Sequence, residues 1–136
     1  MNNQPPIINI FEKAVRKAGR ALLKDFGEIE NLQIQSKNLG DFVTKADLIS
    51  EKLLLETLQY YYPKYSYLSE EKGVIEGSHE EMIIVDPIDG TRNFAAGIPF
   101  FSLVIGLTLN NKIILGVNYA PLRDEMFYSE KGMGAF

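Results

Sequence analysis

The central segment of this chain reads Met82-Ile83-Ile84-Val85-Asp86-Pro87-Ile88-Asp89-Gly90-Thr91-Arg92-Asn93-Phe94. Its β-branched residues 83–85 predict a buried strand. Because Pro87 cannot donate to a sheet ladder, we expect the strand to end there. Asp89-Gly90 is typical of a turn, and residues 91–94 can begin a short helix. The segment therefore predicts a strand, a tight turn and a helix in quick succession.

The two carboxylates of this segment, Asp86 and Asp89, would lie between the carboxyl end of the strand and the amino end of the helix. Hard divalent cations prefer oxygen ligands, and anions bind to the free N–H groups of a helix start. One turn could therefore hold both a metal and a phosphate. The local pattern leaves an alternative open, in which Asp86 and Asp89 only cap and solubilise an ordinary turn.

Composition indicates a globular protein with a restricted choice of catalytic chemistry. The 136 residues are 46% hydrophobic and 24% charged, with a formal net charge of −4. This charge is not typical of a general nucleic-acid binder. The chain has no cysteine and one histidine, which disfavours thiolate nucleophiles, multi-histidine metal sites and a Ser-His-Asp triad. A metal would have to be held mainly by oxygen.

The sequence predicts neither secretion nor membrane insertion. Residues 1–6 lack a charged region followed by an apolar stretch, so no signal peptide is indicated. The longest apolar run, residues 100–109, is too short to span a bilayer. We expect a cytoplasmic protein without a membrane partner.

An amphipathic helix is predicted near the start of the chain. Apolar residues recur at helical spacing over residues 7–26, and Gly27 supplies a stop signal. Residues 32–35 then alternate between apolar and polar, which predicts a short strand.

A second helix is expected over about residues 45–62, where it would bury Leu48 and Ile49 among others. Thr44-Lys45-Ala46-Asp47 matches the pattern of a capping box ahead of this helix. On that pattern alone, Asp47 is a capping carboxylate.

Strands separated by turn residues make up the rest of the chain. They are predicted over residues 65–68, 101–109, 112–119 and 125–129, with Asn110-Asn111 as a turn that tolerates positive φ. Two helices followed by an antiparallel meander define the α+β class. We expect a single domain over residues 1–136, with the two N-terminal helices packed on a mainly antiparallel sheet.

Taken together, several segments resemble the inositol monophosphatase family of magnesium-dependent phosphatases. They occur in the family's order and spacing and extend over nearly the whole chain. These segments are Asp41-Phe42-Val43-Thr44-Lys45-Ala46-Asp47, Leu68-Ser69-Glu70-Glu71, Asp86-Pro87-Ile88-Asp89-Gly90-Thr91-Arg92-Asn93-Phe94, Gly116-Val117-Asn118-Tyr119-Ala120-Pro121 and Gly132-Met133-Gly134-Ala135-Phe136. Ser69 stands where the family usually has glycine. The resemblance is to the N-terminal half of the family's fold.

The resemblance implies a metal site made of oxygen ligands. Glu70, Asp86 and Asp89 would coordinate Mg²⁺ through their carboxylates, and Ile88 through its backbone carbonyl. Mg²⁺ keeps several waters and takes few carboxylates, so these groups form a reasonable partial ligand set. In hydrolysis of a phosphate monoester, paired divalent ions clamp the attacking and leaving oxygens.

The resemblance also implies roles around the metal. Glu70 and Thr91 would position and activate the attacking water, with Asp47 supporting Thr91. The N–H groups of Gly90 and Thr91 would hold the substrate phosphate. Lys37 is a weaker candidate for the family's loop lysine, because its spacing to the following motif can differ by one residue.

Members of the family continue beyond the position of Phe136 into a second, α/β half with a W-D-x-A-A segment, and this sequence contains no tryptophan. In the family, the aspartate of that segment completes the second metal site. We therefore expect little or no turnover by this chain alone. We also expect its sheet to associate with a separately encoded second half or with a second copy of the chain.

Two functions follow from the resemblance. The first is Mg²⁺-dependent hydrolysis of inositol monophosphate or a related small sugar phosphate. The alternative is a non-catalytic remnant or a regulatory, partner-binding protein, because some bacterial members of the family act in RNA-related regulation.

Overall fold

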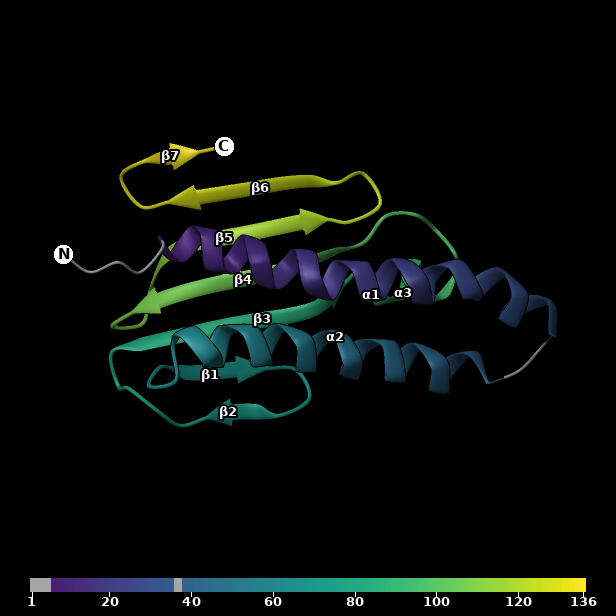
Figure 1. Ribbon diagram of the computed structural model, residues 1–136, viewed down its shortest axis with the longest axis horizontal. Coiled ribbons are helices and arrows are strands. Elements are labelled where there is room, and N and C mark those ends of the chain that lie inside the picture. The colour runs from purple at the N-terminus through teal and green to yellow at the C-terminus, as the bar shows by residue number, and fades with distance from the viewer. Residues whose placement is uncertain (1–5, 36–37) are drawn as a thin grey trace.

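The computed structural model describes residues 6–35 and 38–136 as two layers (Figure 1). Helices α1 (Ile7–Gln35) and α2 (Leu39–Tyr61) lie side by side on one face of a sheet. α1 covers β4 and β5, and α2 covers β1 and β3. The predicted α+β class, with two helices on a mainly antiparallel sheet, is confirmed.

The described residues form a seven-stranded sheet in the order β2-β1-β3-β4-β5-β6-β7. Its strands are β1 (Ser66–Ser69), β2 (Gly73–Ile75), β3 (Glu81–Asp89), β4 (Ser102–Leu109), β5 (Lys112–Ala120), β6 (Glu125–Glu130) and β7 (Gly134–Ala135). Helix α3 (Thr91–Ala95) follows β3 directly. All neighbouring strands are antiparallel except β1 and β3, which are parallel. The short edge strands β2 and β7 were not predicted from the sequence.

The core lies between the helix layer and the sheet. Phe11 and Leu22 of α1, Leu54 of α2, and Ile83 and Leu103 of the sheet are all fully buried there. Each such side chain contributes about 1.5–3 kcal/mol by leaving water. The core therefore fixes both helices against the strands from which the candidate site is built.

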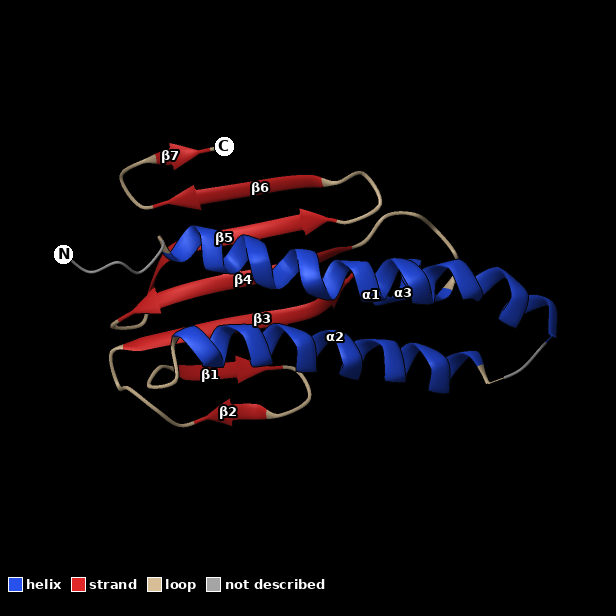
Figure 2. Cartoon of the chain, viewed as in Figure 1, coloured by secondary structure: helices blue, strands red, loops and turns tan. Residues whose placement is uncertain are grey.

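An aromatic cluster attaches the central turn to this core. The Phe94 ring of α3 packs edge-on against Phe101, with ring centroids 5.0 Å apart, and Phe26 of α1 contacts both rings. Gln33 near the end of α1 also donates a hydrogen bond to the Ala95 carbonyl. α3 thereby lies behind the C-terminal half of α1 (Figure 2).

The predictions for the first helix were wrong at its end. α1 continues through Gly27 and includes residues 32–35, where we expected a short strand. Ile29 is buried and extends the apolar stripe by a further turn. Glycine in a helix costs about 1 kcal/mol, which packing of this stripe can outweigh.

The predictions for the second helix were also wrong in two respects. α2 begins at Leu39, so Thr44 lies inside the helix and its hydroxyl donates to the Gly40 carbonyl rather than capping. Leu48 and Ile49 are 44% and 46% exposed. The buried stripe instead includes polar residues, namely Asp47, Ser50 and Glu51.

Strand β3 does not end at Pro87 as expected but continues to Asp89. Its ladder with β4 is irregular between Asp86 and Asp89, so Pro87 stands where regular pairing is interrupted. α3 follows as predicted.

No helix in the described ranges is both long and apolar enough to cross a membrane.

Candidate functional site

The parallel pairing of β1 and β3 brings two carboxylate-bearing strand ends together. In this pairing Ser69 lies opposite Val85, so Glu70 and Asp86 are the next residues along each strand. Strands that run in the same direction end at the same edge of a sheet, and Figure 2 shows β1 and β3 running in the same direction on either side of α2. Residues distant in sequence thus meet at one edge.

A cavity of about 440 Å³ opens at this edge. Residues of both strand ends and of the turn line it. Those predicted as site residues are Glu70, Asp86, Ile88, Asp89, Gly90 and Thr91. The structure therefore gathers the predicted metal ligands and phosphate-binding groups around one space.

Asp47 reaches the same region from α2. One of its carboxylate oxygens lies within 4.8 Å of carboxylate oxygens of both Glu70 and Glu71. Asp47 is only 6% exposed, and its Oδ1 has no hydrogen-bond partner among the described residues. The same holds for the buried Oδ1 of Asp86. A buried carboxylate oxygen without a hydrogen-bond partner destabilises the folded chain, so a ligand bound to either atom would be stabilising.

Burial and mutual repulsion raise the pKa values of these carboxyls. Burial, followed by the charges of Glu70 and Glu71, raises the pKa of Asp47 to about 7. Burial and then Asp86 raise the pKa of Glu70. Burial and then Asp89 raise the pKa of Asp86, partly offset by a backbone hydrogen bond from Ile88. The raised pKa values show that Asp47, Glu70 and Asp86 lie close to other negative charges, and we call these three residues with Glu71 the acidic cluster.

No basic side chain balances this charge in the parts of the chain that the structure describes. The ion pairs there are Arg16 with Glu12, Arg16 with Asp124, and Lys52 with Glu56. Carboxylates and a carbonyl are the ligands that hard divalent cations prefer. The donor set, with its two unpaired buried oxygens, therefore fits a divalent metal ion.

Thr91 is positioned differently from the arrangement that the resemblance implies. Its hydroxyl donates to the Ile88 carbonyl at 3.1 Å, rather than to Asp47. The bond ties the first residue of α3 to the carbonyl oxygen proposed as a metal ligand.

Gly90 is required by the shape of the turn. Its φ is +91°, which L side chains rarely adopt, and a Cβ atom there would lie 3.1 Å from the Phe100 carbonyl oxygen. It precedes α3, whose first backbone N–H groups lack acceptors within the helix. These N–H groups are available to an anion beside the carboxylates.

Lys37, the remaining candidate, lies outside the described residues.

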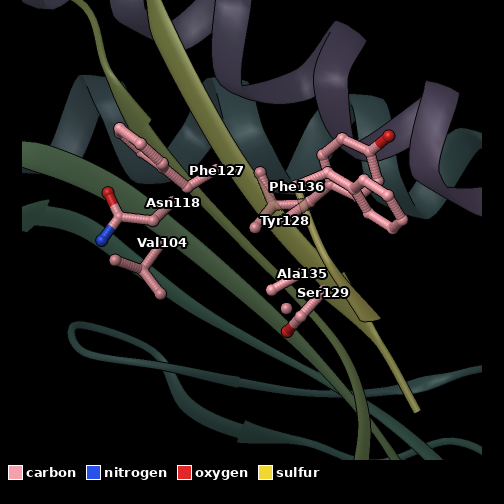
Figure 3. Close-up of a pocket in the computed structure, with 9 residues that line it drawn as sticks. Val104, Asn118, Phe127, Tyr128, Ser129, Ala135 and Phe136 are labelled. Carbon is pink, nitrogen blue, oxygen red and sulfur yellow. The ribbon is translucent and has the colours of Figure 1, made fainter. Parts of the chain in front are cut away.

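A second, apolar cavity of about 520 Å³ lies on the β4–β7 part of the sheet (Figure 3). We call it the apolar cavity; its lining includes Val104, Asn118, Phe127, Tyr128 and Phe136. The Tyr128 and Phe136 rings stack with centroids 5.4 Å apart. It contains none of the predicted site residues.

Three residues close to the site were not assigned a role from the sequence. Glu71 contributes an oxygen to the cluster with Asp47 and Glu70. Ser50 and Glu51 of α2 hydrogen-bond the backbone of the two strand ends. The sequence does contain a sign of this arrangement, because Asp47, Ser50 and Glu51 recur at helical spacing. The apolar residues between and around them made this polar stripe hard to recognise.

Comparison with known proteins places this chain and its fold in a family. The model of the inositol monophosphatase family matches residues 3–136. The chain belongs to the inositol monophosphatase family.

Individual relatives agree with this assignment. The chain is 44% identical over 131 residues to an inositol-1-monophosphatase of Mesorhizobium japonicum, covering 96% of this chain and 49% of that protein. It is 38% identical to the Nus factor SuhB of Haemophilus influenzae, again covering 96% and 49%. Among solved structures, the extragenic suppressor protein suhB of Bartonella henselae matches with a TM-score of 0.84 and 41% identity, covering 96% of this chain and 50% of that one. The chain spans about half the length of the relatives it matches.

Proposed function

We propose that this chain provides the metal- and phosphate-binding turn of a Mg²⁺-dependent phosphatase acting on inositol monophosphate or a related small sugar phosphate. The observation that carries the proposal is the unpaired buried Oδ1 of Asp86, in a cavity that Glu70, Ile88 and Asp89 also line. Family membership supports the reaction class.

The residues that would hold the metal are Glu70, Asp86, Asp89 and the Ile88 carbonyl. When bound, Mg²⁺ supplies charge compensation for the phosphoryl oxygens and polarises the group under attack. Thr91, through its bond to Ile88, keeps that carbonyl oriented.

Substrate and water would be positioned by groups of this chain. The Gly90 and Thr91 N–H groups at the start of α3 would bind the phosphate oxygens. Glu70, exposed at the cavity, would accept a proton from the attacking water with Thr91 orienting it. Asp47 would not bind the metal directly but would influence Glu70 through its neighbouring charge.

The proposal includes little or no turnover by the 136-residue chain alone. The relatives are about twice as long, and catalysis in the family would draw on both halves. The missing contribution could lie on the same polypeptide or on a separate one. The apolar cavity, with its exposed aromatic rings, is the surface that we assign to the second half.

The test is Mg²⁺ binding by calorimetry together with phosphate release from inositol 1-phosphate. We expect saturable Mg²⁺ binding, weakened about 10-fold or more by Asp86→Asn or Asp89→Asn, and release far below that of a full-length relative. Asp41→Asn, an exposed carboxylate in the first turn of α2, is the matched control. Mg²⁺ affinity unchanged by both site variants would refute the ligand assignment. Mg²⁺-dependent release that Asp89→Asn abolishes, at the rate of a relative, would refute the expected inactivity.

A second candidate function is partner binding without catalysis. It is favoured by the relatives named Nus factor SuhB, 38% identical in Haemophilus influenzae. The same assay separates the two functions, because a binding protein would have no need of the Mg²⁺ affinity that Asp86 and Asp89 confer.

A further inference from the structure

Two consecutive side chains of α2 each bond the backbone of a different strand end. The Ser50 hydroxyl donates to the Pro87 carbonyl of β3 at 2.8 Å. The Glu51 carboxylate accepts the N–H of Glu71, just beyond β1, at 3.1 Å. Both side chains are buried, with 0% and 1% of their surface exposed.

The two hydrogen bonds from Ser50 and Glu51 lie just beyond the last paired residues of β1 and β3. The pairing of β1 with β3 stops at Ser69 opposite Val85. Glu70 and Asp86, which lie one residue further, are therefore not held against each other by strand pairing. Asp86 stays paired with Val104 of β4, so the α2 side chains add a link between the two strand ends.

The geometry of the peptide bond transmits this constraint. The N–H of Glu71 belongs to the planar peptide group that begins at Glu70, so fixing it restricts the Glu70 backbone. The Pro87 carbonyl lies between Asp86 and Ile88, which both carry candidate ligand oxygens. Because Ser50 and Glu51 are neighbours on one helix, the two anchor points keep a fixed separation.

We propose that Ser50 and Glu51 are positioning residues, which set the distance between Glu70 on one side and Asp86 and Ile88 on the other before a metal binds. This inference rests on the proposed function. Ligand geometry must be held within about 0.5 Å for strong binding, and outer partners of metal ligands commonly change metal affinity 10–100-fold. Without the two bonds, the strand ends would have to become ordered when Mg²⁺ binds.

The test measures Mg²⁺ affinity in Ser50→Ala, Glu51→Ala and Glu51→Gln of the whole chain by calorimetry. We expect about 10-fold weaker binding in both alanine variants, although no ligand has been removed. Glu51→Gln should stay within about threefold of wild type, because its amide oxygen can accept the same N–H bond. Equal weakening in Glu51→Gln and Glu51→Ala would overturn the positioning role of Glu51, since the charge would then matter.

Two other residues of α2 provide matched controls. The buried Thr57 hydroxyl bonds the Leu53 carbonyl of its own helix, and the exposed Glu56 pairs with Lys52. We expect wild-type Mg²⁺ affinity in Thr57→Ala and Glu56→Gln. Weakening in Thr57→Ala as large as in Ser50→Ala would mean a general effect of helix destabilisation, and it would overturn the inference.

A metal-free measurement separates this inference from the proposed function. Hydrogen exchange of the Glu71 amide, followed by NMR without Mg²⁺, should be faster in Glu51→Ala than in wild type or Thr57→Ala. An unchanged rate would overturn the inference even if the wild-type chain binds Mg²⁺. A wild-type chain that binds no Mg²⁺ would refute the proposed function and the metal-directed role with it. Wild-type binding with undiminished affinity in both alanine variants would refute only the inference.

Discussion

The acidic cluster, which includes Asp47 of α2 and Glu70 and Asp86 at two strand ends, differs from the apolar cavity around Phe127 and Phe136 in the groups that it leaves unsatisfied. At the cluster, two buried carboxylate oxygens have no hydrogen-bond partner among the described residues. At the cavity, aromatic rings are exposed, with Phe136 63% accessible. An ion can satisfy the first region, whereas only another apolar surface can satisfy the second. The proposed metal binding and the proposed association with a second half can therefore be tested one at a time.

The largest expected effect comes from covering the apolar cavity. Mixing this chain with the remaining half of the Mesorhizobium japonicum relative should raise Mg²⁺-dependent phosphate release on the order of 100-fold or more, because a reaction that depends on several ligands acting together loses most of its rate when one is missing. Phosphate release from inositol 1-phosphate is the measurement. The same mixture made with Asp89→Asn should stay at background. No increase, with both halves folded, would contradict the assignment of this surface.

An intermediate effect is expected from the charge of the acidic cluster. Burial among other carboxylates raises the pKa of Asp47 from 3.8 to about 7. Between these two values the folded chain holds a proton at Asp47 that the unfolded chain has released. The free energy of unfolding of the metal-free chain should therefore fall as pH rises from about 4 to about 7, and the part of stability lost should amount to a few kcal/mol.

Urea unfolding at several pH values without metal measures this dependence. Asp47→Asn should flatten the profile and make the metal-free chain more stable than wild type at pH 8, since the amide carries no charge. If the free energy of unfolding of Asp47→Asn fell with pH as steeply as that of wild type, Asp47 would not be the source of the pH dependence. Mg²⁺ should stabilise the wild-type chain more at pH 8 than at pH 5, because its ligands must be deprotonated.

The smallest effect is expected from a single change at the apolar cavity. Phe136→Ser should reduce self-association of the chain while changing Mg²⁺ affinity less than about twofold and stability by about 0.5 kcal/mol or less. Light scattering over a concentration series is the measurement. Tyr60→Ser, which removes a 79% exposed ring from α2, should leave association unchanged. A Phe136→Ser variant that associates like wild type would show that the apolar cavity does not mediate self-association.

Strong local signals made much of this fold predictable from the sequence. The Asn110-Asn111 turn was expected to tolerate positive φ, and both residues adopt it, at 50° and 63°. The strands on either side were predicted to within about one residue. Helix ends were less predictable, because the packing of Ile29 carries α1 past Gly27 in a way that only tertiary structure reveals.

The structure brings Glu70, Asp86 and Asp89 to one cavity, as the motifs at the two strand ends led us to expect, and their roles stay predictions. The candidate site was not predictable where a helix supplies the support. We expected the apolar Leu48 and Ile49 to mark the buried face of α2. Ser50 and Glu51 lie on that face instead. Hydrogen bonds from a helix to strand ends depend on how the layers pack, and amino-acid spacing within one helix does not encode that packing.

The parallel pairing of β1 with β3 also has a kinetic consequence. The hairpins from β4 to β6 join their strands by short turns, and such local contacts form early in folding. β1 and β3 cannot be joined by a tight turn, so their shared edge, where Glu70 meets Asp86, should be assembled late. Interactions that form after the transition state act on unfolding rather than on folding. Mg²⁺ should therefore slow the unfolding of this chain and leave its rate of folding nearly unchanged.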